Sequence, residues 1–128
     1  MKHDPGSNYT LAEEVAAASY TDAATNGTGV DHAKGPSVSF FISVSAVGTS
    51  LNVKAQYADA SDFSDAVDYP ASDEAGNDDA ITEITAAGTA QLNVPNPRGR
   101  YTRVVATGVG AVVYSITSVL GPLRSVAA

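Results

Sequence analysis

The sequence contains no cysteine and no tryptophan, and it is poor in basic residues. Without cysteine there is no disulfide framework, no thiol nucleophile and no thiolate metal site. The two histidines, His3 and His32, are far apart, so a structural zinc site is not expected. Seven Lys and Arg residues against fourteen Asp and Glu residues give a formal net charge of −7. This balance argues against nucleic-acid binding and against an anionic membrane surface, because both interactions depend on Lys and Arg.

Long apolar runs are absent as well. No apolar segment is long enough to span a membrane as a helix, and Met1–Gly6 lacks the apolar run of a signal peptide. We therefore expect a soluble protein that is made in the cytoplasm. The length of 128 residues fits one domain, and the abundance of Ala, Ser, Thr and Val predicts a core of small side chains.

Two segments near the C-terminus alternate with the period of a β-strand. They are Arg100–Thr107 and Val112–Leu120, and one face of the second carries Val112, Tyr114, Ile116, Ser118 and Leu120. Gly108 and Gly110 lie between them and permit the positive φ angles of a short hairpin loop. The pattern predicts a β-hairpin.

The same alternation recurs upstream. The strand after Pro36 places one apolar face on Val38, Phe40, Ile42, Val44 and Ala46. Leu51–Tyr57 follows the turn at Gly48, which predicts a second hairpin, and Ala80–Ala86 and Thr89–Val94 supply two more strands. We count about seven or eight short strands at intervals of about 8–12 residues, which indicates an all-β, mostly antiparallel sandwich or barrel.

The N-terminal residues 1–20 are predicted to be an arm, and residues 21–128 a single β-sandwich domain with a short C-terminal tail. Thr10-Leu11-Ala12-Glu13 has the spacing of a capping box, and Leu11–Ala18 is rich in helix formers. A short helix and an extended arm that orders against a neighbour both stay open.

Acidic residues are concentrated between Ala55 and Pro97, where nine of them occur without a base. A solvated loop is favoured over a calcium site, because Asp73–Asp79 lacks the spacing of a helix-flanked calcium loop. Asp62 and Asp65 have no feature that would make them an acid/base pair. No nucleophile, phosphate-loop or dinucleotide pattern is present, so we expect no enzyme, no metal and no cofactor.

Four of the seven basic residues form a C-terminal arginine cluster: Arg98, Arg100, Arg103 and Arg124. Arginine is favoured at interfaces because its planar guanidinium pairs with carboxylates at two points. The cluster could bind an acidic partner or pair copies head to tail. Solvated strand-end charges, or pairing of Arg100 within its own sheet, explain it equally well.

Three segments resemble small head proteins of tailed bacteriophages, the decoration or cement proteins. They are Asn96–Thr107 with the strand closing on Val119-Leu120-Gly121-Pro122, the turn Thr21–Asp31, and the aspartate-rich turn Gln56–Asp65. The sequence departs from the family pattern at Ala60-Ser61, where a glycine is common.

The resemblance implies a β-sandwich or jelly-roll, without catalysis, on the outer surface of the phage head. The partners would be the major capsid protein and sister copies in a homotrimer, and binding would stabilise contacts between capsid subunits. Within that expectation the predicted contacts are the arginine cluster together with Tyr9 and Leu11 of the arm. A phage tail or baseplate subunit is the alternative.

Overall fold

The computed structural model describes residues 10–69 and 81–121, and these residues form ten β-strands and no helix. The strands are β1 (Thr10–Thr21), β2 (Ala24–Asn26), β3 (Val30–Asp31), β4 (Ser37–Val47), β5 (Ser50–Ala58), β6 (Val67–Asp68), β7 (Ile81–Ile84), β8 (Gly88–Val94), β9 (Tyr101–Val109) and β10 (Ala111–Gly121).

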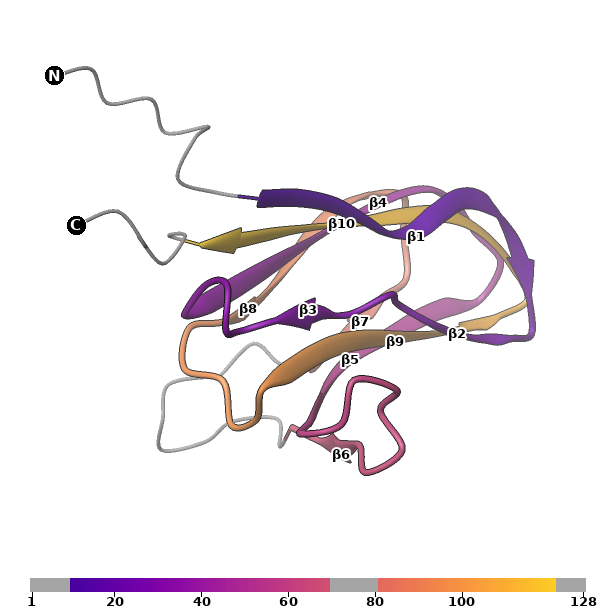
Figure 1. Cartoon of the computed structure of the whole chain (residues 1–128). Coiled ribbons are helices and arrows are strands. Elements are labelled where there is room, and N and C mark those ends of the chain that lie inside the picture. Colours follow the sequence, from indigo (N-terminus) through magenta and orange to yellow (C-terminus); the bar gives the residue numbers. More distant parts are fainter. Residues whose placement is uncertain (1–9, 70–80, 122–128) are drawn as a thin grey trace, which may run out of the picture.

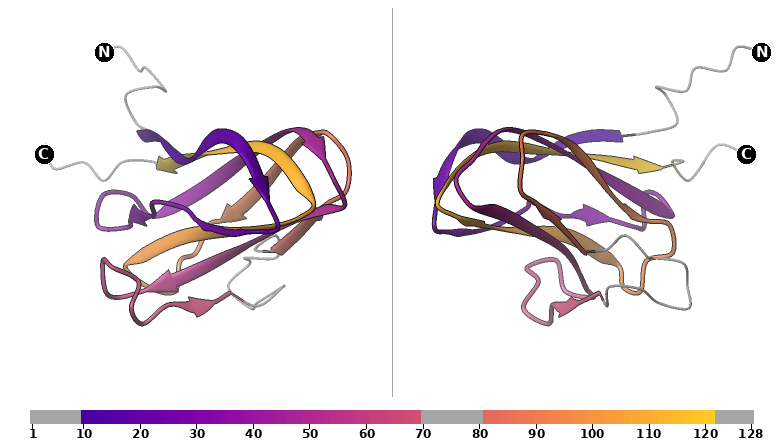
Figure 2. Two further views of the ribbon diagram at one scale, coloured as in Figure 1. Left: turned by 90° about the vertical axis from the view of Figure 1, so that its right-hand side faces the viewer. Right: turned by 180° about the vertical axis from the view of Figure 1, so that it is seen from behind.

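The strands form two antiparallel sheets that face each other (Figure 1 and Figure 2). Sheet A has the order β1-β10-β4-β8, and sheet B has the order β2-β9-β5-β6. The short strand β3 also pairs with β9, and β7 also pairs with β5, so that each sheet has four strand positions. This order, with neighbours far apart in the chain, is that of a jelly roll. The predicted all-β sandwich is confirmed.

Both predicted hairpins have the right strands but the wrong pairing. β9 belongs to sheet B and β10 to sheet A, and β5 and β4 are divided between the sheets in the same way. The glycine turns are therefore crossovers between sheets. Two consecutive strands can bury their apolar faces as neighbours in one sheet or as members of two facing sheets. The pattern of apolar residues is the same in both cases. Alternation alone does not separate the two arrangements.

Two crossovers meet the end of β1 at one corner of the sandwich. The main-chain N–H of Gly110 donates to Oδ1 of Asp22 at 2.7 Å, and the N–H of Asp22 donates to the Gly110 carbonyl at 3.2 Å. Gly110 has a φ of 76°. A Cβ on Gly48 would lie 2.8 Å from the nitrogen of Ala111, so the two crossovers approach too closely for a side chain.

The helical alternative for Leu11–Ala18 is wrong, because Thr10–Thr21 forms β1 and pairs antiparallel with β10. Helix propensity differs by only a few tenths of a kcal/mol between most residues, so a ladder along β10 and the burial of Val15 outweigh it. The segment from Thr10 onward is an edge strand of sheet A. Residues 1–9 of the predicted arm lie outside the described residues.

The core lies between the sheets and follows the predicted faces, with one exception. Ala46 is exposed instead of buried, because the register between β10 and β4 shifts between Val113 and Tyr114. Each fully buried large apolar side chain contributes about 1.5–3 kcal/mol. The large side chains that are almost completely buried include Phe40, Ile42, Leu51, Leu92 and Ile116.

Candidate functional site

Three of the predicted interface residues lie together at the start of β9. Arg98 and Arg100 are in the loop before this strand, and Arg103 is within it, on the side of sheet B. Leu11 is in β1 of sheet A, where its side chain is 65% exposed. The structure therefore does not bring Leu11 and the arginines into one patch. Tyr9 and Arg124 lie outside the described residues.

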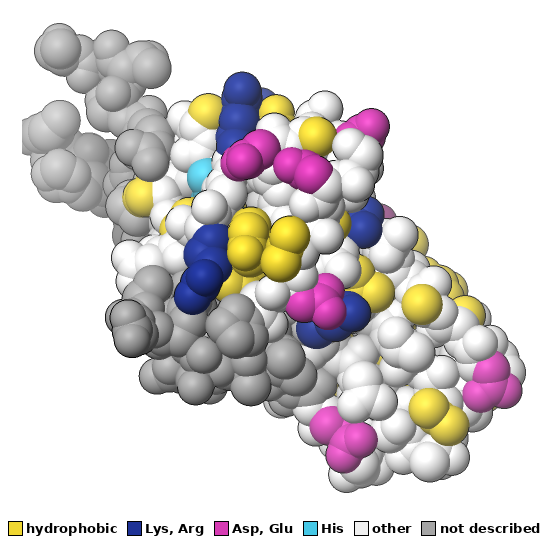
Figure 3. Space-filling model, turned by 90° about the horizontal axis from the view of Figure 1, so that it is seen from below, with side chains coloured by type: hydrophobic (Ala, Val, Ile, Leu, Met, Phe, Trp, Pro, Cys, Tyr) yellow, Lys and Arg dark blue, Asp and Glu magenta, His cyan; other side chains and the backbone are white. Residues whose placement is uncertain are grey.

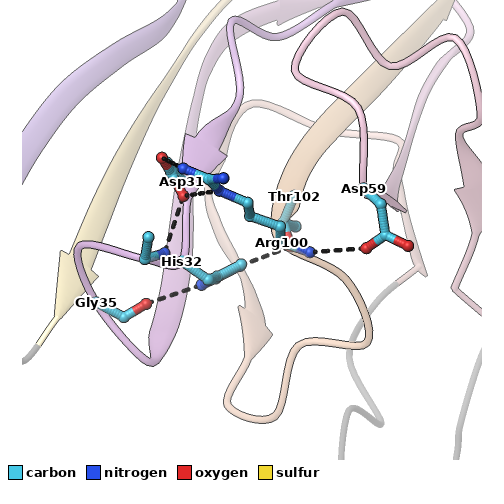
Figure 4. A network of polar contacts seen from close by, with 7 residues as sticks. Asp31, His32, Gly35, Asp59, Arg100 and Thr102 are labelled. Atoms are coloured by element: carbon cyan, nitrogen blue, oxygen red, sulfur yellow. Dashed lines mark hydrogen bonds and ion pairs between the residues drawn. The ribbon is translucent and has the colours of Figure 1, made fainter.

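Arg100 pairs with Asp31 of β3 within its own sheet (Figure 4). Its Nε and Nη2 atoms lie 3.2 Å from the two carboxylate oxygens of Asp31. The hydrogen bond from Arg100 lowers the pKa of Asp31 below its usual value. The guanidinium carbon also lies 5.2 Å from the ring centroid of Tyr101. Of the alternatives that the sequence left open, the structure favours pairing of Arg100 inside the sheet.

Arg103 is also held by side chains of sheet B. Its Nε–H donates to Oε1 of Gln56 at 2.9 Å, and its guanidinium carbon lies 4.6 Å from the ring centroid of Phe63. Phe63 in turn packs edge-on against Tyr101, with ring centroids 6.2 Å apart. The two aromatic rings therefore lie between the two arginines, in the order Arg100, Tyr101, Phe63, Arg103.

The aspartates of the turn between β5 and β6 bind main-chain N–H groups of the same turn. Asp65 accepts from the N–H groups of Asp59 and Ala60, each at 3.2 Å. Asp62 accepts from the N–H of Ser64 at 3.0 Å, and this hydrogen bond lowers the pKa of Asp62. These carboxylates stabilise the turn, in the manner of Asx turns.

A buried histidine follows Asp31 directly and bonds to β9, and no sequence pattern indicated its burial. His32, 6% exposed, lies directly after β3. Its Nδ1 lies 3.0 Å from the Gly35 carbonyl oxygen, which only accepts, so Nδ1–H is the donor. Its Nε2 shares a 2.7 Å hydrogen bond with the hydroxyl of Thr102 in β9 (Figure 4). His32 thus anchors the turn after β3 to β9.

Glu14 is a second buried polar group that sequence reasoning missed. Regular alternation would bury only one of Glu14 and Val15, but a bulge in β1 turns both inward. The Glu14 carboxylate accepts from the N–H of Gly29 at 2.7 Å and lies 3.3 Å from the hydroxyl oxygen of Ser118. Burial raises the pKa of Glu14, and the hydrogen bonds from Gly29 and Ser118 oppose this change.

Charged side chains of both signs lie beside one another on the underside of the molecule, where sheet B and the turn before β6 are found (Figure 3). Lys54 pairs with Asp68 at 3.0 Å in addition to the Arg100–Asp31 pair. The part of the chain that the structure describes has no pocket and no group of His, Asp or Glu side chains placed to hold a metal ion.

None of the described residues belongs to a helix long and apolar enough to cross a membrane. The acidic segment Asp73–Asp79, for which a solvated loop was favoured over a calcium site, lies outside the described residues.

Comparison with known proteins establishes the fold. Neither a family model nor a curated protein matches the sequence. A solved structure described as PBSX exported protein XepA is similar with a TM-score of 0.67 and 11% identity, covering 99% of this chain and 41% of that chain. PirA is similar with a TM-score of 0.51 and 10% identity, covering 94% and 96%. The chain thus spans less than half the length of XepA. At these identities the likeness concerns the β-sandwich alone.

Proposed function

We propose that this chain is a structural protein of a tailed-phage particle: a decoration protein that binds the outside of the head and strengthens contacts between major capsid proteins. One observation carries the proposal. The three segments that resemble decoration proteins are far apart in the sequence, but in the folded chain all three meet around β9.

The contacts between these segments are direct. β2 and β3, within Thr21–Asp31, pair with β9, and the N–H of Gly27 donates to the Val104 carbonyl at 2.7 Å. β5, which leads into the aspartate-rich turn, pairs with β9 on its other side. Phe63 of that turn packs so closely on Gly29 that a Cβ there would lie 2.6 Å from the ring. Thr21–Asp31, Gln56–Asp65 and Asn96–Thr107 therefore form one packed unit on sheet B.

Such a protein acts by binding, and the proposal requires no catalytic step and no cofactor. A single copy could bind the shell weakly. A homotrimer that contacts several capsid subunits at once gains affinity through effective concentration. The proposed location is therefore the outer surface of the head, and the proposed partners are the major capsid protein and sister copies.

The test is to mix the purified full chain with undecorated capsids of its phage, pellet the capsids and count the bound copies. Saturation at a copy number that matches three-fold positions, together with capsids that survive higher temperatures, supports the proposal. If no protein sediments with the capsids, the head role fails. Assembly of the purified protein into tubes or rings would then favour the tail or baseplate alternative.

Charge reversal at Arg98 tests whether the arginine cluster contacts the shell. We expect Arg98→Glu to lower occupancy on capsids, and the melting temperature of each free variant is measured beside it to show that the fold is kept. Lys34→Glu makes the same charge change at another exposed loop position and serves as the control, although Lys34 also interacts with the Asp31 carboxylate. Arg100 is less suitable, since its reversal would place a glutamate beside Asp31 and break an internal pair. Equal occupancy for both variants would contradict a role for Arg98.

A further inference from the structure

The outer face of sheet A differs in chemistry from the rest of the described surface. Every outward side chain of β4 from Ser37 to Ser45 is a serine except Phe41. The outward residues of β10 between Val113 and Val119 are valine, serine or threonine. Among the outward-facing described residues of the four strands, Glu13 is the one charged side chain. Sheet B and its turns carry nearly all the other charges.

One large apolar side chain is exposed near the middle of this face, among Ser, Thr and Gln neighbours. Phe41 lies between Thr117 of β10 and Gln91 of β8, and 44% of its side chain is exposed. Leu11 pairs with Val119 at the β1 edge of the same face. Low charge and an exposed aromatic residue near the centre are features of interface cores, whereas the many serines and threonines are not. Phe41 is therefore the residue of this face that favours an interface.

We propose that two copies of this chain pair through the outer face of sheet A. Ser, Thr, Asn and Gln side chains both donate and accept hydrogen bonds, so a surface rich in them is complementary to itself. A two-fold interface requires such self-complementarity, because the same patch is present on both partners. A surface dominated by carboxylates does not meet this requirement, since two copies would oppose like charges.

Charge favours this face over the alternatives. The chain carries a net charge of −7, so two copies repel one another unless they meet where charge is scarce. Head-to-tail pairing through Arg100 would first have to break its two-point contact with Asp31. Edge-to-edge pairing of two β1 strands is disfavoured, because the register shifts between Glu13 and Ala18 make this edge irregular.

The area is sufficient for a specific pair. Strands lie about 4.8 Å apart and rise about 3.3 Å per residue, so four strands of this length give a face of about 20 by 30 Å, or about 600 Å². Two such faces in contact bury about 1,200 Å², the lower limit of specific protein interfaces. This pairing is independent of the proposed function, because it involves two copies of the chain whether they bind a capsid or a tail or baseplate.

The test measures the mass of the purified full chain over a concentration series by sedimentation equilibrium. We expect the mass to rise from 13.0 kDa to twice that value, whereas a mass that settles at three times that value, as the proposed homotrimer would give, overturns two-fold pairing. Phe41→Lys should raise the dissociation constant of the pair at least about tenfold, because a central aromatic residue is lost and a lysine is buried at two symmetric positions. Val67→Lys is the matched control: Val67 is 48% exposed on sheet B, and its replacement changes the net charge by the same amount.

A second variant and a salt series complete the test. Ser43→Lys leaves Phe41 intact and places a charge on the same face, and it should also weaken pairing while keeping the wild-type melting temperature. Added salt should leave the wild-type pair unchanged or strengthen it, because it screens the remaining repulsion. A wild-type chain that stays monomeric, an assembly unaffected by both lysine substitutions, or an assembly that salt dissociates would each overturn the proposal.

Discussion

Glu14 offers the sharpest test of the packing described above. The residue is 4% exposed, and its carboxylate connects the bulge of β1 to Gly29 in the loop between β2 and β3, and to Ser118 in β10. Two substitutions separate its charge from its hydrogen bonds. Glu14→Gln removes the charge and keeps an oxygen that accepts from Gly29 and an NH₂ group that donates to Ser118. Glu14→Ala removes both contacts.

The expected magnitudes follow from these contacts. A hydrogen bond to a charged group contributes about 1.5–3 kcal/mol, and a buried polar group left without a partner costs about 1–3 kcal/mol. We therefore expect Glu14→Ala to lower the free energy of unfolding at pH 7 by about 2–4 kcal/mol. Glu14→Gln should be within about 1 kcal/mol of the wild type at that pH. It weakens the hydrogen bonds to a charged group, but it also removes the cost of burying that charge, and the two effects offset each other.

The pH dependence distinguishes this explanation from simple loss of packing. Burial raises the pKa of Glu14 above its usual value of 4.5, so the folded state binds the proton more tightly than the unfolded state. As the pH falls from neutral through the raised pKa towards 4.5, the wild type gains stability relative to Glu14→Gln, and as the pH rises this gain is lost. The aspartates with lowered pKa, such as Asp31, titrate alike in both proteins and cancel in the difference.

Urea unfolding of the wild type and both variants, at several pH values between 4.5 and 7.5, measures these differences. The reasoning is refuted if the difference in free energy of unfolding between wild type and Glu14→Gln does not change with pH. It is also refuted if Glu14→Ala is as stable as the wild type at pH 7.

Two further substitutions test the contacts around β9. Gly29→Ala should lower the free energy of unfolding by about 1–3 kcal/mol or more, because Gly29 has a φ of 95° and a Cβ would strike the ring of Phe63. Gly88→Ala, at a φ of 148° with nothing within 4 Å, carries only the backbone strain and should cost less in the same urea titration. Asp31→Asn should cost at most about 1 kcal/mol, and the loss should shrink in high salt, because the Arg100 pair is exposed. A large, salt-independent loss for Asp31→Asn would contradict this description of the pair.

The sequence was sufficient to predict β4, β5 and β7 to β10 and most of their inward faces, but not β1, β2 or β3. Period-two alternation reports which residues share a face, and Val38, Phe40, Ile42 and Val44 of β4 are buried as expected. Pairing partners were not predictable in the same way. The N–H and C=O groups that pair β10 with β1 and β4 are the same on every strand, so side-chain patterns do not identify the neighbour.

The anchoring residues escaped sequence reasoning for a different reason. Glu14 is turned inward by a bulge, and His32 is buried because Thr102 and Gly35 lie on either side of its ring. Neither feature has a local signature, since each depends on residues that are distant in the chain.

The arginine cluster shows how charge can mislead when only the sequence is read. Arg98, Arg100 and Arg103 attract attention because bases are scarce in this chain. Polar side chains of the same fold also lie within reach of these arginines: Arg100 binds Asp31, and Arg103 binds Gln56. The outer face of sheet A carries one charge among its described residues, Glu13, and its side-chain hydrogen bonds, such as the one between Ser39 and Asn93, join neutral groups. Its serines and threonines drew no attention in the sequence because they carry no distinctive chemistry. The scarcity of charge on a whole sheet face becomes visible only when β1, β10, β4 and β8 are placed side by side.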